Sequence, residues 1–517
     1  MSIRRLIVPV LLAVVFITGC EAVNPSPTTI PTPTASPTAT ATSTATASPT
    51  ATATATVTPT SLPTETPTFT PSPTVVLTPS NTPAPVTPFV YDNWENIPFP
   101  AETVSALGRL PFIAFVNQNN RDTVGDLRTP QPGRAVQTLY YLSPGVTALI
   151  PVLEMDAATG TRIYPAPTGD VFAYFRQDAP GTTGLYIVDL AIRFSGRVLP
   201  IDSMVQRGFL NEPSWAPDGS RMAIALATGY DMDIYTVGRD GTNPTPIVRS
   251  GAYEFFPAWS PDGQYIAFVS DSATCPSWVP GEPGTCDGTG MPAPRGGQLY
   301  IVEVATGALT RLSDAFITEP PRWVNARQIA FASGEPALGD PGRSIWLVDI
   351  FERQPREFRL AFGDTPIKLA ESWSPGGSQV IYQAADGQTE IVLANADGSE
   401  VGRLGGFVFA RYGMAVSWSP DGTRLAVGGV GGQCPYGVVV LRNTAEIIAQ
   451  ANPPPSMCDP IYSPDGRFIA FVGINPRIDG RKDVYYANNN GFGAQNATAS
   501  LRGQIELLGW VGAGAGG

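Results

Sequence analysis

The sequence of 517 residues contains no histidine. A chain without imidazole cannot use a serine–histidine–aspartate or a cysteine–histidine mechanism, and it has no histidine ligand for a metal ion. Basic residues are also scarce, because 32 Lys and Arg stand against 44 Asp and Glu, for a formal net charge of −12. This acidic balance disfavours a general nucleic-acid binder, since affinity for the phosphate backbone depends on basic side chains.

The N-terminus lacks an apolar run long enough to cross a membrane. Leu6–Ile17 is an apolar stretch of 12 residues, whereas a spanning helix needs about 20, and short runs of this kind are typical of cleavable export signals. The next residues complete Ile17-Thr18-Gly19-Cys20, which resembles a bacterial lipobox. We predict a lipoprotein signal peptide over 1–19 and lipidation of Cys20, which would anchor the protein to a membrane. The alternative is an ordinary signal peptide or an anchor helix in which Cys20 has no role.

Residues 20–89 are almost without charge. Between Asn24 and Pro88 the only charged residue is Glu65, and Pro, Thr, Ala and Ser make up nearly all the rest. Such a composition cannot bury enough apolar area to offset the entropy of ordering. We therefore predict a disordered linker, either a spacer through a layer of the cell envelope or a connection with no length requirement. Its Thr/Pro tracts are also candidates for O-glycosylation.

One motif recurs through the remaining residues, 90–517. It consists of an aromatic residue followed by Ser-Pro-Asp-Gly or a close variant, at 214–219, 258–263, 372–377, 417–422 and 461–466, with degenerate copies at 165–169 and 322–326. The aromatic or equivalent positions are 44 to 64 residues apart. Regular spacing on this scale indicates a repeat architecture.

Each copy has the composition of a β-hairpin. Ser-Pro-Asp-Gly suits a tight turn, and an apolar β-forming run such as Tyr265–Val269 follows it directly. A third run comes next, such as Leu299–Val302, and a turn then leads to a short fourth run such as Leu309–Leu312. Four antiparallel strands per repeat form one blade of a β-propeller, so the pattern predicts an all-β propeller over 90–517.

The two ends of this region complement each other. Strand-like runs at Phe112–Val116, Leu139–Leu142 and Ala148–Leu153 lack an innermost strand before them, while Glu506–Val511 resembles an innermost strand with nothing after it. We predict that these four runs form one composite blade, which leaves few exposed sheet edges. The count is then eight blades; seven is the alternative if residues 101–156 form a separate cap.

The repeated Trp-Ser-Pro-Asp-Gly motif and the strands after it, over about residues 100–512, resemble the TolB-like propeller repeats. The propellers of prolyl-oligopeptidase-type enzymes share this pattern, but a Gly-x-Ser-x-Gly elbow and length for a hydrolase domain are missing. The resemblance implies a binding or scaffolding module of the cell envelope. It also implies that partner peptides bind at one mouth of the central channel.

Four cysteines remain after Cys20, and an exported chain can keep disulfides. They allow three connectivities, of which Cys275–Cys286 is the local choice, leaving Cys434–Cys458. The alternative is a metal site, which no Cys-x-x-Cys pair or histidine supports. The first pair lies within the insertion Thr274–Pro294, where Trp278 serves either recognition or merely loop packing. We predict structural disulfides, no metal and no cofactor.

Acidic residues directly precede several predicted innermost strands. They are Glu212, Glu254, Glu319, Glu371 and Asp459. In a propeller the chain enters each innermost strand near one mouth of the channel, so these carboxylates would form a negative rim that attracts a cation, a basic peptide or an amine. Each residue on its own is equally consistent with a solvated loop carboxylate or a backbone cap.

These observations predict a monomeric, lipid-anchored, extracytoplasmic protein of the cell envelope. We expect a non-catalytic function, the binding of a protein, a peptide or an envelope glycan, and assign no catalytic residue. The alternative is a glycan-active lyase or hydrolase that uses a pair of carboxylates, since propellers host such sites and this chemistry needs no imidazole.

Overall fold

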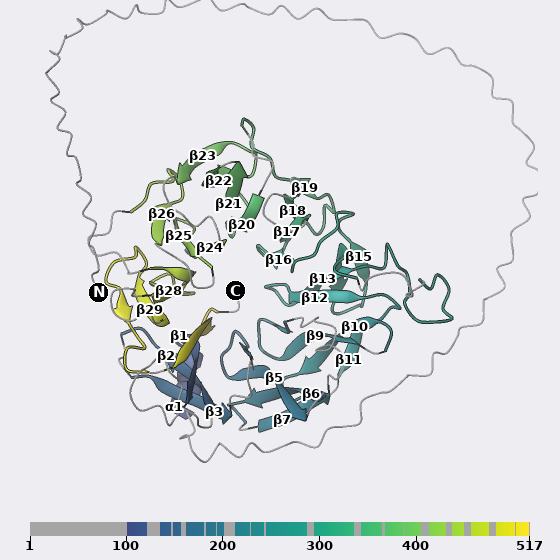
Figure 1. Cartoon of the computed structure of the whole chain (residues 1–517), viewed down its shortest axis with the longest axis horizontal. Helices are drawn as coiled ribbons and strands as arrows, with labels where there is room; N and C mark the ends of the chain where they lie inside the picture. Colours follow the sequence, from purple (N-terminus) through teal and green to yellow (C-terminus); the bar gives the residue numbers. More distant parts are fainter. Residues whose placement is uncertain are drawn as a thin grey trace, which may run out of the picture. The chain divides into compact units, whose positions relative to one another are not determined.

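A computed structural model describes the chain from residue 101 to residue 515 with internal gaps (Figure 1). The described residues are 101–120, 135–145, 148–156, 162–179, 182–192, 194–200, 212–227, 229–241, 244–286, 294–334, 343–363, 368–386, 388–404, 413–430, 437–448, 456–474, 482–501 and 503–515. The predicted signal peptide with Cys20 and the predicted linker therefore lie outside the described residues.

The described residues form antiparallel sheets, preceded by a short helix that the sequence did not predict, α1 (Ala101–Leu107). Six sheets have four strands each. Their strands are β1 (Pro111–Asn120), β2 (Ala135–Leu142), β3 (Ile150–Asp156) and β31 (Gln504–Gly512); β4 (Ile163–Pro165), β5 (Val171–Ala179), β6 (Thr182–Asp189) and β7 (Phe194–Pro200); β8 (Ser214–Trp215), β9 (Arg221–Ala227), β10 (Met232–Gly238) and β11 (Thr245–Val248); β12 (Glu254–Trp259), β13 (Tyr265–Ser270), β14 (Gln298–Glu303) and β15 (Leu309–Arg311); β16 (Arg322–Trp323), β17 (Gln328–Ser333), β18 (Ser344–Asp349) and β19 (Arg356–Glu357); and β20 (Lys368–Trp373), β21 (Gln379–Asp386), β22 (Gln388–Asn395) and β23 (Glu400–Leu404).

A seventh sheet contains two antiparallel sets of strands. The first set is β24 (Met414–Trp418), β25 (Arg424–Gly429) and β26 (Val438–Leu441), and the second is β27 (Cys458–Tyr462), β28 (Phe468–Ile474), β29 (Lys482–Asn488) and β30 (Gln495–Asn496). A single parallel pairing, Gly429 with Cys458, joins them. Each set on its own has the strand order of one sequence repeat.

The predicted turn chemistry is present in every copy of the Pro-Asp-Gly motif. In the turn at 260–263 the Gly263 amide donates to Ser260 O at 2.9 Å, and Gly263 has a φ of 70°. A side chain would strain this left-handed backbone, so glycine is required. The Ser260 hydroxyl donates to Asp262 Oδ1 at 2.6 Å and accepts from Tyr265 N at 2.9 Å, which fixes the start of the next strand.

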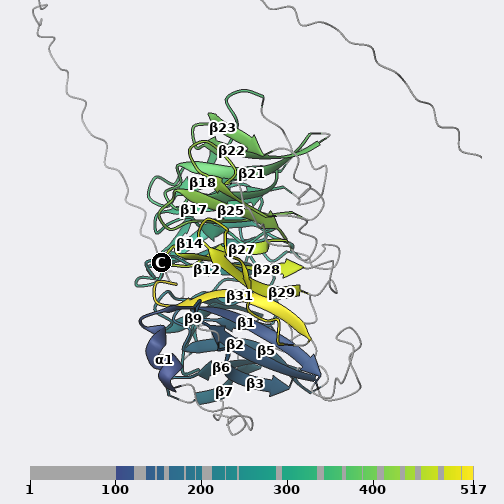
Figure 2. The same ribbon diagram turned by 90° about the vertical axis from the view of Figure 1, so that its left-hand side faces the viewer.

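The predicted composite sheet is confirmed. Its strand order is β3-β2-β1-β31, with Phe112 opposite Val511 and Phe115 opposite Leu507. A register irregularity separates the two pairs at Ala114/Phe115. Figure 2 shows β31, in yellow, lying along β1, in dark blue. Residues 101–156 are therefore not a separate cap, because three of their strands share a sheet with the C-terminal strand.

Successive sheets share apolar clusters along the chain, and the last also packs on the first. Ile113 and Phe115 of β1 lie in one buried cluster with Ala470 of β28 and Val484 of β29. The motif tryptophans lie at these junctions, as predicted, and are 7 to 9 % exposed at Trp215, Trp259, Trp373 and Trp418. Trp215 Nε1, for example, donates to Tyr164 O of the preceding sheet at 2.9 Å. Trp418 Nε1 likewise donates to Ser372 Oγ at 3.1 Å, whereas Trp259 Nε1 and Trp373 Nε1 are buried without a hydrogen-bond partner. Indole burial is therefore what the four junctions share.

The insertion between β13 and β14 is packed onto its own sheet. Cys275 and Cys286 form the predicted disulfide, and Trp278 Nε1 donates to Asp271 Oδ2 at 2.9 Å. The Trp278 ring meets Tyr253 edge-on with centroids 5.8 Å apart, so this tryptophan serves loop packing. Cys458 is also disulfide-bonded, but Cys434 lies outside the described residues, so their pairing stays a prediction.

We expect the double variant Cys275→Ser/Cys286→Ser to be less stable than the parent by about 2–3 kcal/mol, because the bridge restricts the unfolded chain. Cleavage within 271–286 by a non-specific protease should also become faster. Urea unfolding and limited proteolysis measure both effects, with Thr274→Ala, an exposed position in the same loop, as the control. Unchanged proteolysis of the double variant would contradict the anchoring of the insertion by its disulfide.

No helix within the described ranges is long and apolar enough to cross a membrane.

Candidate functional site

The candidate site lies where the chain enters the innermost strands, at the strand ends opposite the Pro-Asp-Gly turns. All five predicted acidic residues are described. Glu212 and Glu319 precede their strands, and Glu254 and Asp459 lie at the start of theirs. Glu371 was predicted to precede its strand, but it lies within β20 and pairs with Tyr382. The five residues do not form one uniform negative rim. Instead they divide into three local groups, each with its own partners.

Glu254, the first residue of β12, is buried rather than displayed, with 1 % exposure. Its Oε1 accepts hydrogen bonds from Ser250 Oγ at 2.7 Å and Ser270 Oγ at 3.2 Å, while Oε2 is buried without a hydrogen-bond partner. Burial raises the pKa of Glu254 to about 8; the two serine hydroxyls lower it, and the charges of Asp233 and Asp271 raise it further. A neutral, inaccessible carboxyl group cannot attract a ligand by its charge.

Glu319 and Glu371 come together with two arginines. Arg343 Nη2 contacts Glu319 Oε2 at 2.8 Å, and Arg322 Nη1 donates to the backbone oxygen of Glu371 at 3.4 Å. Burial raises the pKa of Glu371, the two arginines lower it, and Glu319 raises it. The Arg343 side chain is only 3 % exposed. This group therefore contains one ion pair, between the buried Arg343 and the partly exposed Glu319, and its formal charges balance.

Glu212 belongs to a third group at the junction of β31, β4 and β8. Arg162, directly before β4, pairs with Glu212 and also contacts Glu506 of β31, with Nε to Oε1 at 3.5 Å. Glu212 and Arg162 are more than half exposed, so solvent screens this pair and its contribution to stability is small. Arg162 is informative through its position, because this one side chain contacts residues at the starts of β8 and β31 and itself directly precedes β4.

A cavity of about 520 Å³ adjoins this junction and contains the fifth predicted residue, Asp459. Its charged lining consists of Arg162, Lys482, Asp459 and Glu506. Its apolar lining is formed by Val116, Val430, Val472, Ile505 and Leu507. Asp459 has a positive φ of 47°, and Phe256 has a φ of 52° at the equivalent position of β12, so this conformation belongs to the repeat.

Asp459 lines the cavity together with Arg162 and Glu506, and Glu212 lies nearby through its ion pair with Arg162. Glu319 and Glu371 belong to a second group, and Glu254 is buried on its own. Three basic residues of these groups were not predicted from the sequence, where only acidic residues pointed to a site. They are Arg162 and Arg343, which form ion pairs, and Lys482, which lines the cavity. Arg162 could have been found, since it precedes β4 as Glu212 precedes β8.

Within the ranges that the structure describes, no group of three Cys, Asp or Glu side chains is arranged to hold a metal ion. The cavity at Asp459 combines charges of both signs with valine and leucine side chains. Such a lining suits non-covalent recognition of a ligand with polar and apolar parts.

No family model matches the chain. It is similar to the protein TolB homolog of Chlorobium luteolum, with 34% identity over 105 residues, 20% of this chain and 22% of that protein. It is also similar to the TolB homolog of Chlorobium chlorochromatii, with 26% identity over 167 residues, 32% of each chain. The chain therefore matches only a third or less of the length of these curated relatives.

Among solved structures, TolB from Acinetobacter baumannii is similar with a TM-score of 0.30 and 18% identity, over 55% of this chain and 62% of that one. An oligogalacturonate lyase in complex with manganese is similar with a TM-score of 0.39 and 14% identity, over 73% of this chain and 97% of the lyase.

Proposed function

Since this chain carries a TolB-like β-propeller, as its repeats predict, we propose that it is a non-catalytic binding protein of the cell envelope. Its ligand would be a segment of a protein or another envelope component, bound at the cavity lined by Arg162, Asp459, Lys482 and Glu506. The observation that carries this proposal is the cavity itself, because it lies at the entrances of three innermost strands and offers both charged and apolar contacts.

The proposed architecture has eight blades. The six four-stranded sheets supply six of them, and the two strand sets of the seventh sheet supply one each. The single pairing between Gly429 and Cys458 supports this division, since all other pairings of the two sets are internal. In this arrangement the innermost strands surround one channel, and the cavity at Asp459 belongs to its mouth.

The proposed location is outside the cytoplasm, with Cys20 as the lipidated anchor and residues 20–89 as the linker to the membrane. The motif around Cys20 and the partial similarity to TolB homologues support an envelope location. A linker of this composition would let the propeller reach partners away from the membrane surface.

A photo-crosslinking amino acid at Val430 tests the binding site, because Val430 lines the cavity and is 39 % exposed. We expect the full chain to form a discrete crosslinked product in envelope preparations. The same amino acid at Leu309, an apolar position 54 % exposed on a different sheet, is the matched control. Identical products from both positions, or none from Val430, would exclude the cavity as the binding site.

Asp459→Asn in the Val430-labelled chain then tests the contribution of charge. Asparagine tolerates the positive φ of residue 459, so the backbone is preserved while the carboxylate is lost. We expect the yield of the product to fall at least fivefold. The rival glycan-active enzyme is tested in parallel with the parent chain on an oligosaccharide panel, with and without EDTA; cleavage of any member would replace the non-catalytic proposal.

A further inference from the structure

Strand β31 pairs with β1 along one edge and, among the described strands, with none along the other. It is also the longest strand of its kind. The first strands of the other sequence repeats have two to six residues, whereas β31 has nine. The described part of the chain therefore leaves a long strand edge open at the end of the composite sheet.

The cavity at Asp459 runs along this open edge. Four consecutive residues of β31, Gln504 to Leu507, line it. They face opposite ways, because Glu506 contacts Arg162 beside β4, whereas Leu507 packs against Val472 of the seventh sheet. A cavity that reaches both faces of a strand passes around the edge that β1 does not cover, so the main chain of β31 borders this cavity.

The main-chain groups of residues 504–507 make no hydrogen bond to a described residue outside β1. In an antiparallel pair, alternate residues direct both their N–H and their C=O away from the partner strand. Two of these four residues therefore present a donor and an acceptor to the cavity. Strand edges of this kind readily accept a further strand.

The side chains of β31 set the pattern that an added strand has to carry. Gln504 and Glu506 lie on one face, where Glu506 contacts Arg162. Ile505 and Leu507 lie on the other face, in an apolar cluster with residues of β28 and β29. Side chains of neighbouring strands contact each other on the same face of a sheet. A segment with alternating polar and apolar residues therefore matches both faces.

We propose that the cavity at Asp459 binds its partner by strand addition, in which an exposed, extended segment of a protein pairs with residues 504–507 of β31. The segment would carry alternating polar and apolar side chains. Main-chain hydrogen bonds would provide the affinity, and the alternation of side chains would provide the selectivity. This inference rests on the proposed function and specifies its ligand, since a glycan has no peptide groups with which to continue a sheet.

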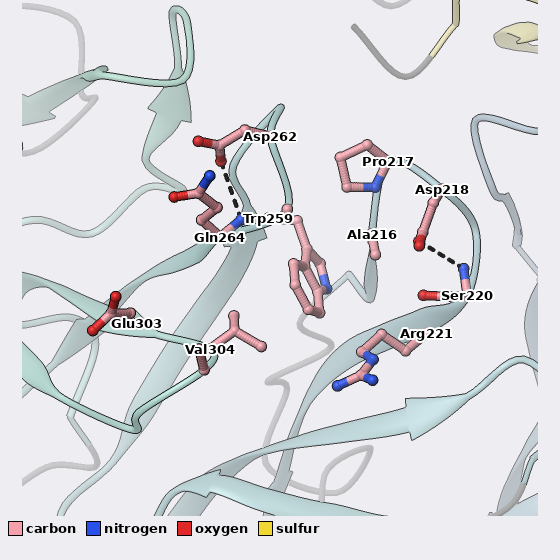
Figure 3. A pocket seen from close by; sticks show the side chains of 12 residues that line it. Ala216, Pro217, Asp218, Ser220, Arg221, Trp259, Asp262, Gln264, Glu303 and Val304 are labelled. Atoms are coloured by element: carbon pink, nitrogen blue, oxygen red, sulfur yellow. Dashed lines mark hydrogen bonds between the residues drawn. The ribbon is translucent and has the colours of Figure 1, made fainter.

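A second cavity, of about 570 Å³, lies at the Pro-Asp-Gly end and provides a contrast (Figure 3). Two turns border it, and their main-chain groups are already bonded. Ser220 N donates to Asp218 Oδ1 at 2.9 Å, and Gln264 N donates to Asp262 Oδ1 at 3.1 Å (Figure 3). Gln264 O accepts from Val304 N at 2.9 Å. We therefore expect no strand addition at this second cavity.

Calorimetric titration of the full chain with acetyl-Gly-Thr-Val-Thr-Val-Thr-Gly-amide tests this proposal. Two N-methylated forms are the matched probes, one methylated at the main-chain nitrogens of both valines and the other at those of the first two threonines. Alternate N–H groups of an added strand point toward β31. Methylation of one set should therefore weaken binding at least tenfold, while the other form should bind within twofold of the unmodified peptide.

Two neighbouring leucines of β31 locate the binding. Leu507 lines the cavity, whereas Leu508 packs against the cluster that contains Leu107 and Val511. We expect Leu507→Ala to weaken binding of the unmodified peptide at least threefold, because it removes the apolar neighbour of an added strand. Leu508→Ala should bind as the parent does, and so should Val304→Ala, which alters the second cavity.

Equal binding of the two methylated forms overturns strand addition. Failure of the unmodified peptide to bind also overturns it, as does unchanged affinity in a folded Leu507→Ala protein. A crosslinked envelope product from Val430 alongside any of these results would keep the cavity at Asp459 as the binding site and remove main-chain pairing as its mode of binding. The two proposals therefore fail separately.

Discussion

A chain that ends at Gly503 is expected to lose its cooperative fold and to aggregate. The truncation removes β31, so the edge of β1 is left unpaired along eight residues, from Pro111 to Gln118. It also removes Trp510 and Val511, which are 9 % and 2 % exposed and pack in the clusters on either side of the composite sheet. An exposed strand edge beside an open apolar core promotes aggregation. Size-exclusion chromatography and circular dichroism measure the result.

A chain that ends at Ala513 keeps the whole of β31 and serves as the control for the truncation. It should elute and unfold as the full chain does. Trp510→Ala is a milder test of the same junction, since its indole Nε1 donates to Ile461 O at 2.9 Å. We expect a loss of about 3–5 kcal/mol from this substitution. A soluble, cooperative monomer from the Gly503 truncation would show that β31 is dispensable for closure.

Glu254→Gln should make the protein more stable than the parent at alkaline pH. In the folded state the pKa of Glu254 is about 8, against an ordinary value of 4.5, so the folded protein holds a proton that the unfolded chain has released between these values. The contribution of Glu254 to stability is therefore full below pH 4.5 and is lost as the pH rises toward 8 and beyond. A difference of this size corresponds to on the order of 5 kcal/mol.

Urea unfolding of both proteins at pH 5, 7 and 9 measures this effect as the difference between their midpoints. The advantage of Glu254→Gln should grow from pH 5 to pH 9, because glutamine stays neutral beside Asp233 and Asp271. Glu212→Gln is the control, since its side chain is 57 % exposed and its removal should produce no such trend. A constant difference between Glu254→Gln and the parent across this range would mean that Glu254 is already ionised in the folded protein.

The repeat architecture was accessible from sequence because its signals are local. Pro-Asp-Gly fixes a turn whatever surrounds it, and the glycine of each turn has the positive φ that the motif requires, as at Gly263 and Gly422. The pairing of Phe112–Val116 with the C-terminal strand followed from counting strands at the two ends. The helix α1 was missed, since seven residues carry too little periodicity to distinguish a helix.

The partners of the acidic residues were not accessible in this way. Arg162 meets Glu212 and Glu506, which lie in other sheets, so the contact depends on how three strands are placed relative to one another. The burial of Glu254 depends on Ser250, Ser270 and the insertion that packs beside them.

The composite sheet pairs two segments that the ribosome synthesises at very different times. Asn117 and Gln504, which share a hydrogen bond between β1 and β31, are 387 residues apart in the chain. Ribosomes make β1 before β31, so a nascent chain keeps one edge of β1 unpaired until residues 504–512 have been synthesised. Only a product that includes β31 can cover that edge, so a chain interrupted before residue 504 exposes it.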